Sequence, residues 1–260
     1  MMLKKGLNTA KIGSLNLTST SEKRLLEHLG SSISQGKKVF VTTPNPEFLV
    51  FAKENPWFKK VLNEADIAIP DGIGLLWAGR FLGRPIKERI SGTDLMAKLC
   101  QEAAQKKWFV YLIGGQPGVA EKALLVLKKR YPGLKGWSET GPELELVRGR
   151  WTRDSKRGIE EIVKKINSQK PDLLFIAFGM GKQEKFIADN WPQLKIKLAM
   201  GVGGAFDYLS GEIPRAPGWM RNLGLEWLFR LLRQPWRGKR QLRLVKFVWL
   251  IFKERLSKTL

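Results

Sequence analysis

The sequence predicts an α/β fold in which helices cover both faces of a mostly parallel sheet. Short apolar runs alternate along the chain with segments of about ten residues that have helical periodicity, a pattern typical of strands joined by crossover helices. Near Arg215 the composition changes, because cations and tryptophans become concentrated from there on. We therefore expect a Rossmann-like core at residues 1–214 and a basic, amphipathic helical appendage at residues 215–260.

Each predicted element has a local signal. Ser21 and Glu22 belong to a capping box ahead of an apolar helical stretch, so a helix begins there. Thr93 and Asp94 are expected to cap a helix that ends at about Gln105. Buried strands are predicted at residues 38–41, 65–69 and 108–113, and further strands at 133–140, 173–178 and 198–202. Further helices are predicted from Gly72 and at residues 46–55, 56–63, 119–131 (with Leu124, Leu125 and Leu127 inward), 159–168 and 184–191.

Composition narrows the class of function. A formal net charge of +22 favours polyanionic partners, such as nucleic acid, anionic lipid headgroups or nucleotide diphosphates. The single cysteine, Cys100, excludes an internal disulfide and a multi-cysteine metal site, and its helical setting predicts a buried thiol. The single histidine, His28, excludes a two-histidine metal site and disfavours a histidine-based triad. A general base is therefore expected to be a carboxylate, or less readily a lysine or tyrosine.

The sequence also bears on location. The first eleven residues carry lysines but no apolar segment of a secretory signal. No apolar run reaches the roughly 18 residues that span a bilayer. We therefore expect a cytoplasmic protein that is soluble or peripheral on the inner face of the cell membrane.

Polar side chains follow two neighbouring strands of the predicted sheet. Thr43 and Asn45 follow one strand, and Asp71 follows the next on a tight turn between Pro70 and Gly72. Ligands of open α/β sheets bind outside the carboxyl ends of the strands. A carboxylate beside a hydroxyl and an amide suits a polyhydroxy substrate. The alternative is that Asp71 only caps the helix that opens at Gly72.

Glycine-rich loops follow the later strands, where glycine lets a ligand approach the backbone closely. The glycines taken as sugar or phosphate contacts are Gly114, Gly115, Gly179 and Gly203. No loop has the spacing of a P-loop or an early dinucleotide-binding fingerprint. Gln183 adds a long amide at a helix start. Arg89 is long enough to reach a phosphate, and the alternative for it is a surface ion pair with Glu88.

The chain from Arg215 to Lys258 contains twelve Lys or Arg residues but only two acids, and four of the ten tryptophans. Apolar residues recur there at three- and four-residue steps: Leu242, Val245, Trp249, Phe252 and Leu256. A basic helix with Trp and Phe on its apolar side is typical of helices that lie in a membrane interface. The alternative is a terminal helix docked on the core, with a solvated basic face.

Together these motifs resemble the WecG/TagA/CpsF glycosyltransferases, in order and spacing, from about Lys37 to beyond Trp227. The motifs are Thr43-Pro44-Asn45-Pro46, Pro70-Asp71-Gly72-Ile73-Gly74, Arg89-Ile90-Ser91-Gly92-Thr93-Asp94, Gly114-Gly115, Phe178-Gly179-Met180-Gly181-Lys182-Gln183-Glu184 and Gly201-Val202-Gly203-Gly204-Ala205-Phe206-Asp207. The resemblance implies transfer of N-acetylmannosamine, or a related sugar, from a UDP-sugar donor. The acceptor would be undecaprenyl-diphosphate-linked N-acetylglucosamine, in the synthesis of teichoic acid or another cell-surface polysaccharide.

The resemblance also implies roles for individual residues. Asp71 matches the family's catalytic base. The residues that match its substrate contacts are Thr43, Asn45, Arg89 and Gln183. An appendage that docks on an anionic membrane surface and helps to close the site matches the chain from Arg215 onward. Its arginines cannot be matched one by one, and the candidates are Arg215, Arg230 and Arg233.

The expected reaction is an inverting, metal-independent transfer without a cofactor. Asp71 would take the proton of the acceptor hydroxyl, while arginines and Gln183 stabilise the leaving diphosphate. The sequence has no Asp-x-Asp motif to hold a metal. The main alternative is a nucleic-acid-binding α/β protein, but no helix-turn-helix or RNA-binding signature is present. A second is a dinucleotide-dependent enzyme using the Gly201–Gly204 loop, without its usual early fingerprint. Whether the active form is a homo-oligomer stays open.

Overall fold

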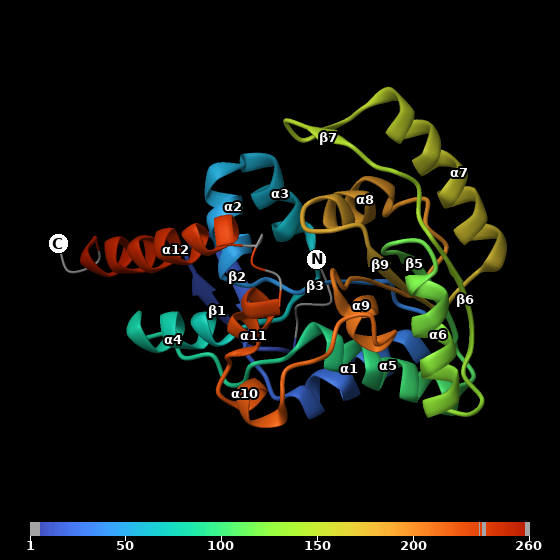
Figure 1. Cartoon of the computed structure of the whole chain (residues 1–260), viewed down its shortest axis with the longest axis horizontal. Helices are drawn as coiled ribbons and strands as arrows, with labels where there is room; N and C mark the ends of the chain where they lie inside the picture. The colour runs from blue at the N-terminus through green and yellow to red at the C-terminus, as the bar shows by residue number, and fades with distance from the viewer. Residues whose placement is uncertain (1–5, 234, 236–237, 258–260) are drawn as a thin grey trace.

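The computed structural model describes residues 6–233, 235 and 238–257, and its centre is a six-stranded sheet (Figure 1). The strands lie in the order β4-β3-β10-β9-β5-β6, and every neighbouring pair is parallel. Their bounds are β3 (Val39–Thr42), β4 (Ile67–Ala68), β5 (Phe109–Gly114), β6 (Lys135–Glu139), β9 (Leu173–Ala177) and β10 (Leu198–Gly201). The predicted α/β class and parallel sheet are confirmed.

Helices cover both faces of this sheet, because its strands are apolar on both sides. Val39 and Val41 of β3 face one core cluster, and Phe40 faces another. The first cluster packs under α1 (Glu22–Ser34), α5 (Gly92–Lys106), α6 (Val119–Arg130) and α9 (Ala205–Leu209). The second packs under α7 (Arg153–Gln169) and α8 (Lys182–Asn190), which lie on the opposite side in Figure 1.

A third apolar cluster lies beside the β4 edge of the sheet. It joins an antiparallel hairpin, β1 (Thr9–Ile12) and β2 (Leu15–Thr18), to α2 (Pro46–Glu54), α3 (Pro56–Glu64) and α4 (Ile73–Phe81). This hairpin was not predicted from the sequence. Neither was a second one, formed by β7 (Leu146–Val147) and β8 (Arg150–Trp151).

Two local predictions are wrong. Ser91 rather than Thr93 or Asp94 caps α5, because its hydroxyl accepts from the Asp94 N–H at 3.4 Å. Leu125 does not face the core: it is 67% exposed, whereas Leu124 and Leu127 of the same helix are buried. Cys100 is buried as predicted, and burial raises the pKa of its thiol.

In the described part of the chain after residue 215, the helices are α10 (Gly218–Asn222), α11 (Glu226–Arg233) and α12 (Gly238–Leu256). Helix α12 lies along α2 and buries Phe247 and Ile251 in the third cluster. Ion pairs also fasten α12 to the core, Lys246–Glu54 at 2.7 Å and Arg84–Glu254 at 3.0 Å. Part of this appendage is therefore docked on the core.

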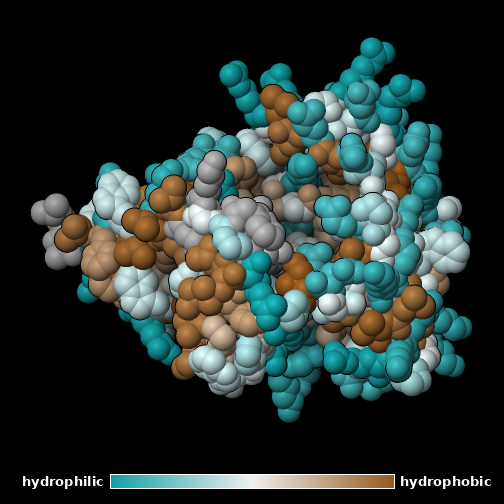
Figure 2. Space-filling model, viewed as in Figure 1, coloured by the Kyte–Doolittle hydropathy of each residue, from teal (hydrophilic) through white to brown (hydrophobic). Residues whose placement is uncertain are grey.

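Another face of α12 is open. Its exposed apolar side chains are Leu242, Val245, Val248, Trp249, Phe252 and Leu256. Figure 2 shows apolar side chains gathered over α12 and the adjoining helices. Trp77 of α4 extends this surface, since its ring lies 6.1 Å from that of Phe252. No described helix is both long enough and apolar enough to cross a bilayer.

Candidate active site

The polar residues predicted at the carboxyl ends of the strands lie where β3, β4 and β10 end. The register pairs Thr42 with Ala68, so the chain leaves β3 beside the turn that follows β4. The Asp71 N–H donates to the Pro44 carbonyl at 2.8 Å, which ties the two exits together. The Thr43 hydroxyl donates to the Gly201 carbonyl at 3.4 Å, at the end of β10. Thr43 and Asp71 thus lie at one edge, as the sequence predicts.

Asp71 does not cap the helix that follows it. Gly72, at φ 119°, is the N-cap of α4, and no side chain caps that helix. The Asp71 carboxylate instead accepts from the Gly92 N–H at 3.1 Å, at the first residue of α5. Gly92 is close-packed here, because a Cβ on it would lie 3.0 Å from Thr43 Cγ2 and 3.4 Å from Asp71 Oδ2.

The surroundings of Asp71 raise its pKa to about 6. Desolvation is the largest cause, since it disfavours the charged carboxylate, and Glu226 and Asp94 raise the pKa further. The Gly92 N–H and the nearby Arg89 guanidinium oppose them. A carboxylate that titrates this close to neutrality is suited to accept a proton.

Gln183 is buried and organises the β10 side of the site. Its Oε1 accepts from the Gly203 N–H at 3.1 Å, and its Nε2 donates to Glu184 Oε1 at 2.7 Å. Glu184 also accepts from the Gly181 N–H at 2.7 Å. Burial raises the pKa of Glu184 to about 7. The amide of Gln183 is therefore fixed in orientation, and it joins the loops that contain Gly181 and Gly203.

The structure places Asn45 and Arg89 as follows. The Asn45 side chain caps α2 by accepting from the Phe48 N–H at 3.1 Å. Arg89 makes no ion pair with Glu88, whose carboxylate instead accepts from the Glu22 N–H at 3.0 Å. Arg89 acts on Asp71 electrostatically and lines a shallow hollow.

The candidate glycines lie along the same edge of the sheet. A Cβ on Gly114 would lie 2.7 Å from the Ala177 carbonyl, so β5 and β9 approach closely there. Gly115 and Gly179 are exposed and have positive φ, and Gly203 donates to Gln183. Only Gly203 is tied by a hydrogen bond to another candidate side chain.

The candidate arginines of the appendage are not equivalent. Arg215 is held in the protein by Asp94, at 2.5 and 2.8 Å, and by Glu226 at 3.3 Å. Arg233 is exposed, and its guanidinium lies 5.5 Å from the ring of Phe229 on its own helix. Arg230 belongs to α11, but its side chain lies outside the described residues.

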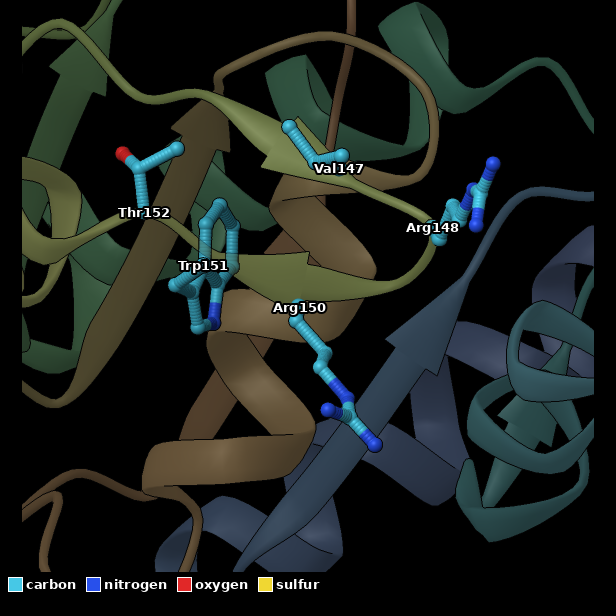
Figure 3. Close-up of a pocket in the computed structure, with 5 residues that line it drawn as sticks. All are labelled: Val147, Arg148, Arg150, Trp151 and Thr152. Atoms are coloured by element: carbon cyan, nitrogen blue, oxygen red, sulfur yellow. The ribbon is translucent and has the colours of Figure 1, made fainter.

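The described part of the structure includes two hollows. One, of about 400 Å³, lies between the core and α10, and Arg89, Ser91, Asp94 and Arg221 contribute to its wall. The other, of about 560 Å³, lies at the β7–β8 hairpin, where Arg148 and Arg150 point away from one another (Figure 3). Only the first contains a candidate site residue. Within the described residues, His, Cys, Asp and Glu form no group of three that could hold a metal.

Several residues of the site were not predicted. Glu184 fixes the amide of Gln183, and Glu226 and Asp94 act on Asp71. Ser91 and Gly92 form the start of α5, to which Asp71 is bonded. Ser91, Gly92, Asp94 and Glu184 lie inside the motifs quoted above, whereas no sequence signal placed Glu226 near Asp71.

Comparisons with known proteins agree with the motif pattern. Residues 10–260 match the model of the "Glycosyl transferase WecG/TagA/CpsF family". A protein of Bacillus spizizenii (strain ATCC 23059 / NRRL B-14472 / W23) is 33% identical over 255 residues, 96% of this chain and 94% of its own. Proteins of Bacillus subtilis (strain 168) and Staphylococcus aureus (strain MRSA252) are 32% and 30% identical, over 87% and 89% of this chain and 84% and 88% of theirs. All three are named N-acetylglucosaminyldiphosphoundecaprenol N-acetyl-beta-D-mannosaminyltransferase.

Proposed function

Because the chain belongs to the WecG/TagA/CpsF family of glycosyltransferases, we propose that it transfers N-acetylmannosamine from a UDP-sugar to undecaprenyl-diphosphate-linked N-acetylglucosamine. The names of its relatives supply the transferred sugar and the acceptor. The observation that carries the proposal is the Asp71 carboxylate, with a pKa of about 6, beside Thr43 at the carboxyl edge of the sheet.

In the proposed mechanism Asp71 is the general base. It accepts the proton of the acceptor hydroxyl as that oxygen attacks the anomeric carbon, on the face opposite the leaving UDP. The anomeric configuration therefore inverts. Thr43 and Asp71 both pack against Gly92, and Thr43 would bind a sugar hydroxyl beside the base.

Charge at the leaving diphosphate is proposed to be stabilised by cations of the protein, without a metal. Arg89 lines the hollow that Ser91 and Asp94 also line, and Lys98, Arg130 and Arg221 contribute to its wall. Preorganised donors of this kind stabilise developing negative charge in a transition state. The glycine loops ending at Gly181 and Gly203 would bind the donor through their backbone.

The acceptor is a membrane lipid, so we propose that the appendage places the enzyme on the cytoplasmic membrane surface. The open face of α12, with Trp249 and Phe252, would enter the interface, and Lys253 and Arg255 lie at the end of the same helix. Apolar burial and attraction to anionic lipids then act together.

A transfer assay tests this function. Purified full-length protein is incubated with a short-chain polyprenyl-diphosphate-GlcNAc acceptor and, separately, UDP-ManNAc, UDP-GlcNAc and UDP-glucose. We expect a β-linked disaccharide from UDP-ManNAc, with the anomeric configuration read by NMR, and the same rate in EDTA. Absence of transfer from every UDP-sugar would contradict the proposed donor class. Loss of activity in EDTA that Mg²⁺ or Mn²⁺ restores would contradict the metal-free mechanism.

A further inference from the structure

Arg215 connects three separate parts of the molecule. It lies just before α10, and its side chain is 24% exposed. Its Nη1 and Nη2 bind the two oxygens of Asp94 at 2.5 and 2.8 Å, in a bidentate pair. Nη2 also donates to the Ser91 hydroxyl at 3.2 Å, and Nε donates to Glu226 at 3.3 Å. A planar guanidinium suits such a fork, because its donors are fixed in one plane.

On the core side, Arg215 binds the start of α5, which also contacts Asp71. Ser91 is the N-cap of α5, Asp94 lies in its first turn, and the Gly92 N–H between them donates to Asp71. The other end is Glu226, in the first turn of α11. Arg215 therefore fastens the beginning of the appendage to the helix terminus on which Asp71 rests.

The two carboxylates that Arg215 binds also act electrostatically on Asp71. Glu226 and Asp94 both raise the pKa of Asp71, while Arg89 and the Gly92 N–H lower it. Arg221 of α10 acts on Asp94 in the same direction as Arg215. Without Arg215, two negative charges near the base would lose their main counter-charge.

We propose that Arg215 is a positioning residue, which holds α10 and α11 against the start of α5 and neutralises Asp94 and Glu226 beside the base. It acts through these carboxylates and not by contact with the substrate. The electrostatic half of this inference rests on the proposed role of Asp71. The mechanical half does not.

Hydrogen exchange measured by mass spectrometry tests the mechanical half on the full-length protein. In Arg215→Ala we expect faster exchange at residues 218–233 and at the start of α5. Lys122→Ala is the matched control, because Lys122 pairs with Glu212 at 2.5 Å and joins α6 to the chain just before Arg215. That ion pair is exposed and includes none of the residues that Arg215 binds, so exchange at those segments should stay unchanged. If hydrogen exchange at these segments is as slow in Arg215→Ala as in the wild type, the proposal is overturned.

The acid limb of the pH profile of kcat/KM tests the electrostatic half. Its midpoint should move to higher pH in Arg215→Ala, stay near wild type in Arg215→Lys, and move to lower pH in Glu226→Gln. Opposite shifts distinguish electrostatics from simple loosening, and Glu226→Gln keeps the test valid if Arg215→Ala folds poorly. Two results in Arg215→Ala would overturn the electrostatic half of the proposal. One is faster hydrogen exchange with an unchanged midpoint of the acid limb. The other is a midpoint that moves to lower pH. Full activity in Asp71→Asn would show that Asp71 is not the base. The hydrogen-exchange result would still decide the mechanical half of the proposal.

Discussion

Opposing influences act on Asp71 at the scale of single residues. Desolvation and two nearby carboxylates favour its protonated form, and one backbone N–H and Arg89 favour the ionised form. The balance leaves a pKa of about 6, so the carboxylate is mostly ionised at neutral pH but still basic. The same Gly92 N–H that lowers the pKa also fixes the orientation of the carboxylate.

The pH dependence of the reaction follows from this pKa. The proposed base, Asp71, has to be ionised to accept a proton, so kcat/KM should be constant above pH 7 and fall about tenfold per pH unit well below pH 6. Transfer assays at fixed times between pH 4.5 and 8 measure this pH profile. Circular dichroism at each pH verifies that the protein stays folded. A flat profile between pH 5 and pH 7 would mean that Asp71 does not titrate in the free enzyme as stated.

Gln183 gives a second test at this scale. Gln183→Ala removes the acceptor of the Gly203 N–H and leaves Glu184 without one buried donor. A buried polar group left unpaired costs about 1–3 kcal/mol, so the free energy of unfolding should fall by that order and transfer should weaken.

Urea unfolding and the transfer assay measure both effects. Gln116→Ala is the control, because Gln116 is an exposed amide in another glycine loop. Equal stability and activity of both variants would show that Gln183 does not organise the site.

Helix α12 has two apolar faces, and only one of them could be predicted from the sequence pattern. Both apolar faces of α12 have helical spacing, and the sequence analysis found only the open one, with Trp249 and Phe252. Phe247 and Ile251, one turn apart, form the docked one. Periodicity does not tell which apolar face meets the core, because that depends on α2 and α4, which lie far away in the sequence.

Substitutions on the two faces of α12 should have different effects on stability and on membrane binding. Phe247→Ala should lower the free energy of unfolding by about 3–5 kcal/mol, because a buried ring leaves a cavity. Trp249→Ala should change stability by only about 0.5 kcal/mol, since its side chain is 60% exposed, yet weaken binding to anionic liposomes. Urea unfolding and liposome sedimentation of both variants test this. The reverse pattern would mean that Trp249 is structural and that the open face does not bind lipid.

The short hairpins escaped the sequence analysis for a related reason. The strands of β1–β2 have four residues each and those of β7–β8 only two, too few for alternation to be distinguished from chance. Turn residues such as Gly13 and Gly149, both at positive φ, were the remaining signal. The longer apolar runs, such as β5 and β9, were predicted to within two residues.

At the scale of the whole molecule, the fold class could be predicted but the strand order could not. Apolar runs between helices indicate a parallel sheet, yet nothing local places β10 between β3 and β9. That insertion brings Gly201 to Thr43 and Gln183 to Gly203. The position of Asp71 near Thr43 could be predicted, because the two residues follow consecutive strands of the sequence. The Arg215–Asp94 pair joins residues 121 positions apart, and no pattern in the sequence indicated it.

The net charge of +22 gives a prediction for the whole chain. Each Lys or Arg near an anionic surface contributes about 1 kcal/mol, and salt screens this attraction. Sedimentation with anionic liposomes should therefore decrease steeply as NaCl rises, and binding to neutral liposomes should be weak. Failure to bind anionic liposomes at low salt would contradict the membrane role of the appendage.

The central claim is that Asp71 is the general base of a sugar transfer, and Asp71→Asn tests it most directly. Asparagine keeps the size and the turn but cannot accept the proton. We expect kcat with UDP-ManNAc and the lipid-diphosphate acceptor to fall by about 10²- to 10⁴-fold, with an unchanged melting temperature. Retention of more than about a tenth of wild-type kcat would contradict the claim.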